Sequence, residues 1–181
     1  MLRTDKPIYK AILILNLLLI IAGVILSVKG ITSKDASVIR IIMSVVAIVC
    51  IVFAAFFIFG GYTKNSAKYY DIYGTLLVIK HLAGILSGRT NSSTTFEIIV
   101  LALSLVITLV ILLNENLGKE KSLVLCGLLV ALSIVLLVYS LNEDNIQTFS
   151  IMNSIVNIDL VCLYGIMTYA KYLDKTERGT R

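Results

Sequence analysis

Long apolar stretches alternate with short polar segments along the chain. Five stretches are clear, and they cover residues 8–28, 40–60, 94–113, 122–141 and 149–172. Each is close to the ~20 residues that an α-helix needs to cross about 30 Å of hydrocarbon. The first stretch is longer than the apolar core of a signal peptide, so we expect an uncleaved helix there. The pattern predicts five membrane-spanning helices.

A sixth stretch, residues 67–87, has two possible interpretations. It is long enough to cross a membrane, but it carries Asp71, Lys80 and His81. It could therefore be a sixth span, or an amphipathic helix that lies on the membrane surface. The distribution of basic residues helps to choose between these two arrangements.

Lys and Arg collect in the cytoplasmic loops of membrane proteins. With six spans and a cytoplasmic N-terminus, eleven of the sixteen basic residues lie inside and four lie outside. With five spans, the same residues divide nine to seven in either orientation. We therefore predict an all-α, polytopic bundle of six transmembrane helices, a single integral membrane domain over residues 1–181, with both termini on the cytoplasmic side of the cell membrane. Five spans plus one amphipathic helix is the alternative.

Composition points to lipid as the main partner of the chain. Hydrophobic residues make up 58% and charged residues 15%, whereas about a quarter of a soluble domain is charged. The net charge of +5 fits lysines and arginines in cytoplasmic loops better than nucleic acid binding, because no basic run with interleaved aromatics is present. We expect a bilayer-embedded protein without a nucleic acid partner.

The motifs of common enzyme and metal sites are absent from the sequence. The chain has no HExxH, GxSxG, GxGxxG or P-loop pattern. Its three cysteines lie in apolar stretches without a CxxC pair, and one histidine cannot make a histidine-rich metal site. We expect no catalytic residues, no metal and no cofactor.

The costly polar residues gather in the third and sixth predicted helices. A charge near the bilayer centre costs about 2.5–3.5 kcal/mol, so it normally faces the bundle interior or a water-filled cavity. Lys80 and His81 lie at nearly the same depth as Asp159, with Asn157 half a turn away and Asn16 near the middle of the first helix. We predict that these five residues converge on a site for a proton or a small polar solute. A structural ion pair between Lys80 and Asp159 is the alternative, and absence of contact is the third possibility.

Other polar and small residues suggest packing rather than chemistry. Asp71, with the neighbouring Tyr69, Tyr70 and Tyr73, is typical of an aromatic belt at the membrane interface. Pairs of small residues spaced by four predict close helix contacts, within the bundle or in a homodimer. These pairs include Gly84 with Gly88 and Gly127 with Ala131, and a packing face is predicted at Glu97, Leu101, Ser104 and Thr108.

Two functions fit these observations. The first is a small-solute transport or binding subunit with its polar site between the third and sixth helices. The alternative is a non-catalytic membrane partner, such as an assembly, immunity or sensory subunit. Either could form a homo-oligomer or associate with other membrane subunits.

Overall fold

The computed structural model is all-α. It describes residues 38–59, 66–90, 95–114, 116–142 and 148–179, together with the separate positions 21, 24, 25 and 28. These residues form five helices and no strand. The first predicted helix, residues 8–28, lies outside the described residues except at those four positions, and so does Asn16.

The five helices follow one another through short connections. They are α2 (Val38–Phe59), α3 (Ser66–Thr90), α4 (Thr95–Leu113), α5 (Lys119–Asn142) and α6 (Thr148–Gly179). The apolar pattern predicts all but one of their ends to within three residues. The exception is the C-terminal end of α6, which continues seven residues beyond the predicted limit of 172. The apolar stretch stops there, but the extension contains Lys175, Glu177 and Arg178, residue types that favour a helix.

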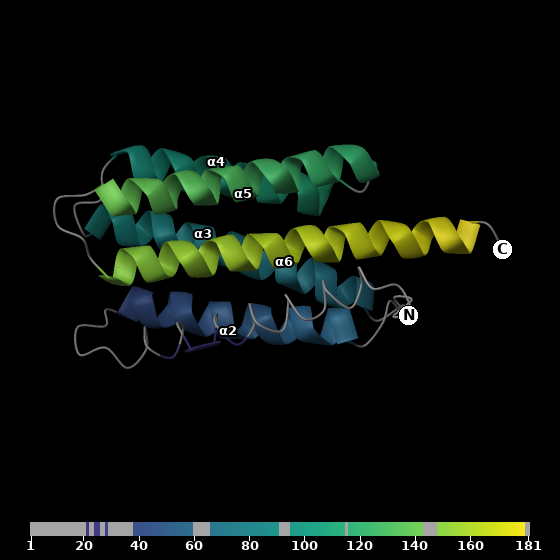
Figure 1. Ribbon diagram of the computed structural model, residues 1–181, viewed down its shortest axis with the longest axis horizontal. Coiled ribbons are helices and arrows are strands. Elements are labelled where there is room, and N and C mark those ends of the chain that lie inside the picture. The colour runs from purple at the N-terminus through teal and green to yellow at the C-terminus, as the bar shows by residue number, and fades with distance from the viewer. Residues whose placement is uncertain are drawn as a thin grey trace.

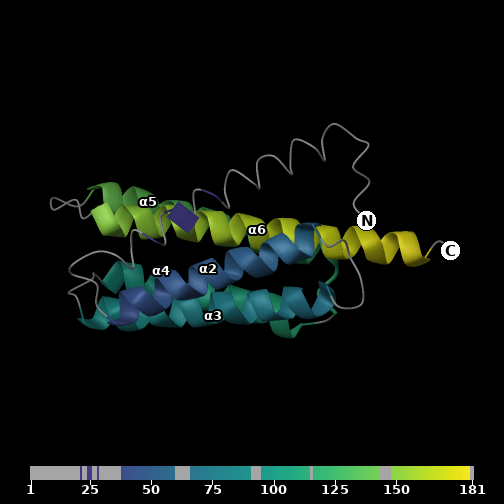
Figure 2. The same cartoon turned by 90° about the horizontal axis from the view of Figure 1, so that it is seen from below.

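Successive helices run antiparallel and side by side, as in an up-and-down bundle (Figure 1). α5 packs extensively on α6, and α3 packs on both α2 and α4 and also contacts α6. The helix α3 is therefore central. It lies lengthwise beside its neighbours rather than across their ends. The C-terminal end of α6 projects past the other helices in both views (Figure 1, Figure 2).

The contact between α5 and its neighbours follows a regular seam. The buried residues of α5 alternate in spacing between four and three, which is the repeat of a coiled-coil interface. They are Ser122, Cys126, Leu129, Ser133, Leu136 and Ser140. Four of these six are small residues, which allow helix backbones to approach closely.

Gly74 and Gly84 mark the close approach of α3 to its neighbours. A Cβ atom at Gly74 would lie 2.8 Å from Leu112 Cδ1 of α4 and 3.0 Å from Tyr164 Oη of α6. A Cβ atom at Gly84 would lie 3.2 Å from Leu101 Cδ1, also on α4. Close packing at Gly84 is therefore confirmed, and Leu101 belongs to the contact, as its predicted packing face requires.

Of the two remaining packing predictions, the one for α4 is confirmed and the one for α5 is wrong. On α4, Ser104 and Thr108 are buried, and their hydroxyl groups donate to backbone oxygens one turn earlier. This confirms a packing face there. On α5, however, Gly127 and Ala131 are exposed, and a Cβ atom at Gly127 would meet nothing within 4 Å. Packing of this pair inside the described bundle is wrong, because it lies on a different face of α5 from the buried seam.

The tyrosines at the start of α3 lie inside the bundle. Tyr70 and Tyr73 are 3% and 0% exposed, and both rings stack on Tyr164 of α6. Tyr70 Oη is 2.9 Å from Thr168 Oγ1, and Tyr73 Oη donates to the Leu160 carbonyl oxygen at 2.6 Å. The predicted interfacial belt is wrong for these two residues. Their hydroxyl groups find partners on α6, which removes the need to face the membrane interface.

Two helices, α4 and α5, are long and apolar enough to cross a membrane. Only 22% of the apolar window of α4 and 28% of that of α5 are buried. Both helices therefore leave most of their apolar side chains partly or fully exposed. A helix in the core of a water-soluble protein buries a larger share of such side chains.

Candidate functional site

Lys80 lies in the interior of the bundle at the contact between α3 and α6. Its side chain is 3% exposed. The Nζ atom donates to Asn157 Oδ1 at 3.1 Å and more weakly to Asn153 Oδ1 at 3.5 Å. The two asparagines are four residues apart on α6, so they lie on one face in successive turns. This spacing lets one helix offer two oxygens to the same amine.

Asn157 connects Lys80 to a third helix. Its Nδ2 group donates to Ser133 Oγ of α5 at 3.0 Å, and Ser133 Oγ donates to the Leu129 carbonyl oxygen at 2.9 Å. The amide oxygen therefore faces a cation and the amide nitrogen faces a hydroxyl acceptor, which satisfies both ends of the side chain. The result is a continuous hydrogen-bonded chain across α3, α6 and α5.

Further cross-helix hydrogen bonds hold α5 against α6 on both sides of this chain. Ser140 and Ser154 hydroxyl oxygens are 3.3 Å apart, nearer the start of α6. Nearer the C-terminal end of α6, Cys126 Sγ donates to Thr168 Oγ1 at 3.7 Å. These contacts fix the rotation of α6 about its axis, and so they hold Asn153 and Asn157 toward Lys80.

Asp159 lies apart from Lys80 despite its similar depth. Two residues along an α-helix correspond to about 200° of rotation, so Asp159 and Asn157 project from nearly opposite sides of α6. Asp159 is 5% exposed, and both carboxylate oxygens are buried without a hydrogen-bond partner among the described residues. The alternative of a structural ion pair with Lys80 is therefore not formed.

His81 projects from a different side of α3 than Lys80. It follows Gly74 by seven residues and precedes Gly84 by three, and both glycines pack against α4. The helical repeat therefore directs His81 toward α4. The ring is 1% exposed, and neither nitrogen has a hydrogen-bond partner within the described part of the chain.

The structure thus brings together two of the five predicted site residues, Lys80 and Asn157. Two residues that the prediction did not include, Asn153 and Ser133, complete the cluster. A sequence signal exists for both of them. Asn153 precedes Asn157 by one helical turn, and Ser133 lies on the 3–4 seam of small residues in α5.

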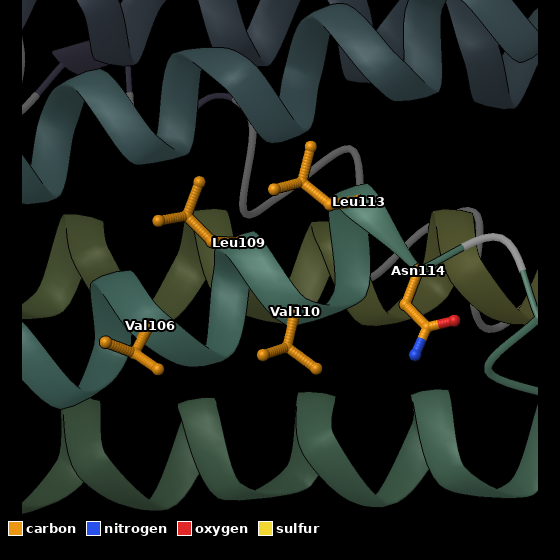
Figure 3. A pocket seen from close by; sticks show the side chains of 5 residues that line it. All are labelled: Val106, Leu109, Val110, Leu113 and Asn114. Carbon is orange, nitrogen blue, oxygen red and sulfur yellow. The ribbon is translucent and has the colours of Figure 1, made fainter.

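A separate hollow of about 400 Å³ lies on α4 (Figure 3). Its lining is apolar except for one asparagine, and it consists of Val106, Leu109, Val110, Leu113 and Asn114. Val106, Val110 and Leu113 are exposed, so the hollow belongs to the outer surface of the bundle. It is suited to hydrocarbon rather than to a polar solute.

No family model, curated protein or solved structure matches this chain. Among the described residues, no group of His, Cys, Asp and Glu is arranged to hold a metal ion. The functional argument therefore depends on the Lys80 cluster, which we define as Lys80, Asn153, Asn157 and Ser133. In chemical terms this cluster combines one cation with hydrogen-bonding amides and a hydroxyl.

Proposed function

We propose that the chain is a multi-pass integral membrane protein of six spans, with both termini cytoplasmic, and that it binds a small polar solute at the Lys80 cluster as a transport or binding subunit. The buried amine of Lys80, held by two neutral amide oxygens, is the observation that carries the proposal. The membrane setting and the orientation have separate support.

The distribution of polarity between the surface and the interior supports a lipid environment. All five described helices expose large apolar side chains, for example Phe56, Leu82, Val106, Val124 and Ile155. The interior holds the polar groups of the Lys80 cluster as well as other buried serines and threonines. Water-soluble proteins rarely expose apolar surface on this scale. Lipid accepts such a surface, provided that backbone polar groups are paired within helices.

The ends of the bundle differ in charge. The antiparallel order brings the start of α3, the start of α5 and the end of α6 to one end (Figure 1). Lys68, Lys119, Lys121 and Lys171 lie there. The positive-inside tendency assigns this end to the cytoplasm. The polar extension of α6 on the same side fits a helix that continues from the membrane into water.

A buried lysine in a membrane interior supports a binding role. Ionisable residues within spans normally face an interior or a cavity and mark the path of a solute or ion. Lys80 has neutral partners on α6, so its charge is available to an additional group. Asn153 is half-buried and lies one turn nearer the start of α6, which indicates access from the end opposite the lysine-rich one.

Labelling of introduced cysteines tests this access. In a background with Cys50, Cys126 and Cys162 changed to Ala, Asn153→Cys and Asn157→Cys should react with a membrane-impermeant thiol reagent added from the side opposite the lysine-rich end. Thr168→Cys is the matched control, because Thr168 is 0% exposed and also bonds across helices. It should not react. A folded protein in which neither asparagine position reacts would contradict a solute site.

A non-catalytic membrane partner is the second candidate, and one observation favours it. Gly127 and Ala131 form a patch of small residues on the outer face of α5. Such patches let another membrane helix approach closely. A partner role predicts that Gly127→Ile disrupts association with another subunit and leaves solute binding intact. Co-purification of a tagged second copy would measure the homo-oligomeric case.

A further inference from the structure

The charge of Lys80 has no acidic counterpart in the described part of the chain. Its acceptors are the two neutral amides, and Asp159 projects from the far side of α6. A buried charge is normally paired with an opposite charge, because an ion loses its favourable hydration when it is removed from water. Within the described residues, the positive charge of the cluster is therefore not balanced by a negative one.

Some hydrogen-bonding groups of the cluster have partners among the described residues, and others do not. An ammonium group has three N–H donors, and both acceptors of Lys80 come from α6, on one side of Nζ. Asn157 uses both ends of its amide. The Nδ2 group of Asn153, by contrast, donates to no described residue. Within the described residues, one donor from Lys80 and the Nδ2 group of Asn153 thus have no partner, and both can serve the same ligand.

We infer that the Lys80 cluster binds a small monovalent anion, such as a carboxylate or a halide, between Lys80 Nζ and Asn153 Nδ2. This inference rests on the proposed function and names its solute class. One positive charge matches one negative charge, whereas a divalent anion would leave a net buried charge. A charge-assisted hydrogen bond from Lys80 and a neutral one from Asn153 suit a carboxylate or halide of small size.

Direct binding of two anions and one neutral analogue tests the inference. Full-length protein, purified in detergent and immobilised, is titrated with radiolabelled acetate, chloride or acetamide at an ionic strength held constant with sulfate. Acetate or chloride should bind saturably, with one site per chain. Binding of both anions will identify a general anion site, and binding of acetate alone will identify a carboxylate site. Either result supports the inference.

Two single variants test whether anion binding depends on the Lys80 cluster or on the bundle in general. Lys80→Met should weaken anion binding by about ten-fold or more, the loss expected for one hydrogen bond to a charged group. Ser104→Ala removes a buried hydroxyl group whose hydrogen bond stays within α4, and it should leave anion binding unchanged. Circular dichroism and gel filtration verify that both variants are folded. Lys80→Met is expected to fold, because an apolar replacement removes a buried charge.

Three outcomes would overturn the inference. They are an absence of saturable anion binding, equal anion affinity in wild type and Lys80→Met, and preference for acetamide. Binding of acetamide alone, with dependence on Lys80, refutes the anion assignment and leaves the proposed polar-solute site in place. Failure of all three probes, together with no labelling of Asn153→Cys, refutes both.

Discussion

At the scale of single residues, Lys80 is central because its buried amine is held, among the described residues, by neutral amide oxygens alone. Asn157 supplies the shorter of its two hydrogen bonds and passes the connection to Ser133 on α5. Removal of Asn157 therefore affects two buried partners at once. The energetic consequence is larger than that of one ordinary hydrogen bond.

The substitution Asn157→Leu should lower the free energy of unfolding by about 2 kcal/mol or more, because it leaves a buried ammonium with a single acceptor at 3.5 Å. The double variant Lys80→Met/Asn157→Leu should recover much of this loss, since the unpaired charge is then absent. Reversible unfolding in detergent micelles, followed by circular dichroism, measures both. Additive losses in the double variant would contradict a direct contact between the two side chains.

The sequence predicts part of the Lys80 cluster and misses the rest for a geometric reason. Distance from the helix ends gives the predicted level of Lys80, Asn157 and Asp159 along the bundle, and the hydrogen bond between Lys80 and Asn157 agrees with it. Rotation about the helix axis is a separate variable, and depth does not determine it. Asp159 therefore projects from the side of α6 that faces away from Lys80. Asn153, one turn from Asn157, projects from the side that faces Lys80.

At the scale of elements, α3 is distinguished by the glycines that bring it close to α4 and α6. The apolar pattern predicts the extent of the described helices well, because the length of an apolar stretch is a direct property of the sequence. Faces are harder to predict. The same spacing of small residues occurs at Gly84, which packs against α4, and at Gly127, which faces outward. Only the packed bundle distinguishes them.

Gly74→Ala should lower the free energy of unfolding by about 1–3 kcal/mol, because the added methyl group would overlap Leu112 and crowd Tyr164. Gly127→Ala is the matched control. It has open space around it, and alanine favours a helix over glycine by up to about 1 kcal/mol. Thermal unfolding in the same detergent compares the two. An equal effect of both substitutions would contradict the close approach at Gly74.

At the scale of the whole molecule, the described helices expose large apolar side chains and bury a mainly apolar core that also contains the Lys80 cluster. Six of the nine basic residues in the described part of the chain lie toward one end. These features agree with the proposed membrane setting of the five antiparallel helices. Charge counting favours a crossing by residues 67–87, and in the structure α3 runs beside α2 and α4 in the centre of the bundle. The contact between α3 and α6 brings Lys80 to Asn157, so a crossing by α3 would place the Lys80 cluster within the membrane.

The sidedness of four exposed positions tests this crossing most directly. Cysteines replace Lys68, Thr95, Asn116 and Asn142, one at a time, in the background without native cysteines, and an impermeant thiol reagent is added to sealed, oriented vesicles. Six spans predict that positions 68 and 116 react from the cytoplasmic side and positions 95 and 142 from the opposite side. Labelling of positions 68 and 95 from the same side would show that α3 does not cross, and would contradict a site between α3 and α6 within the membrane.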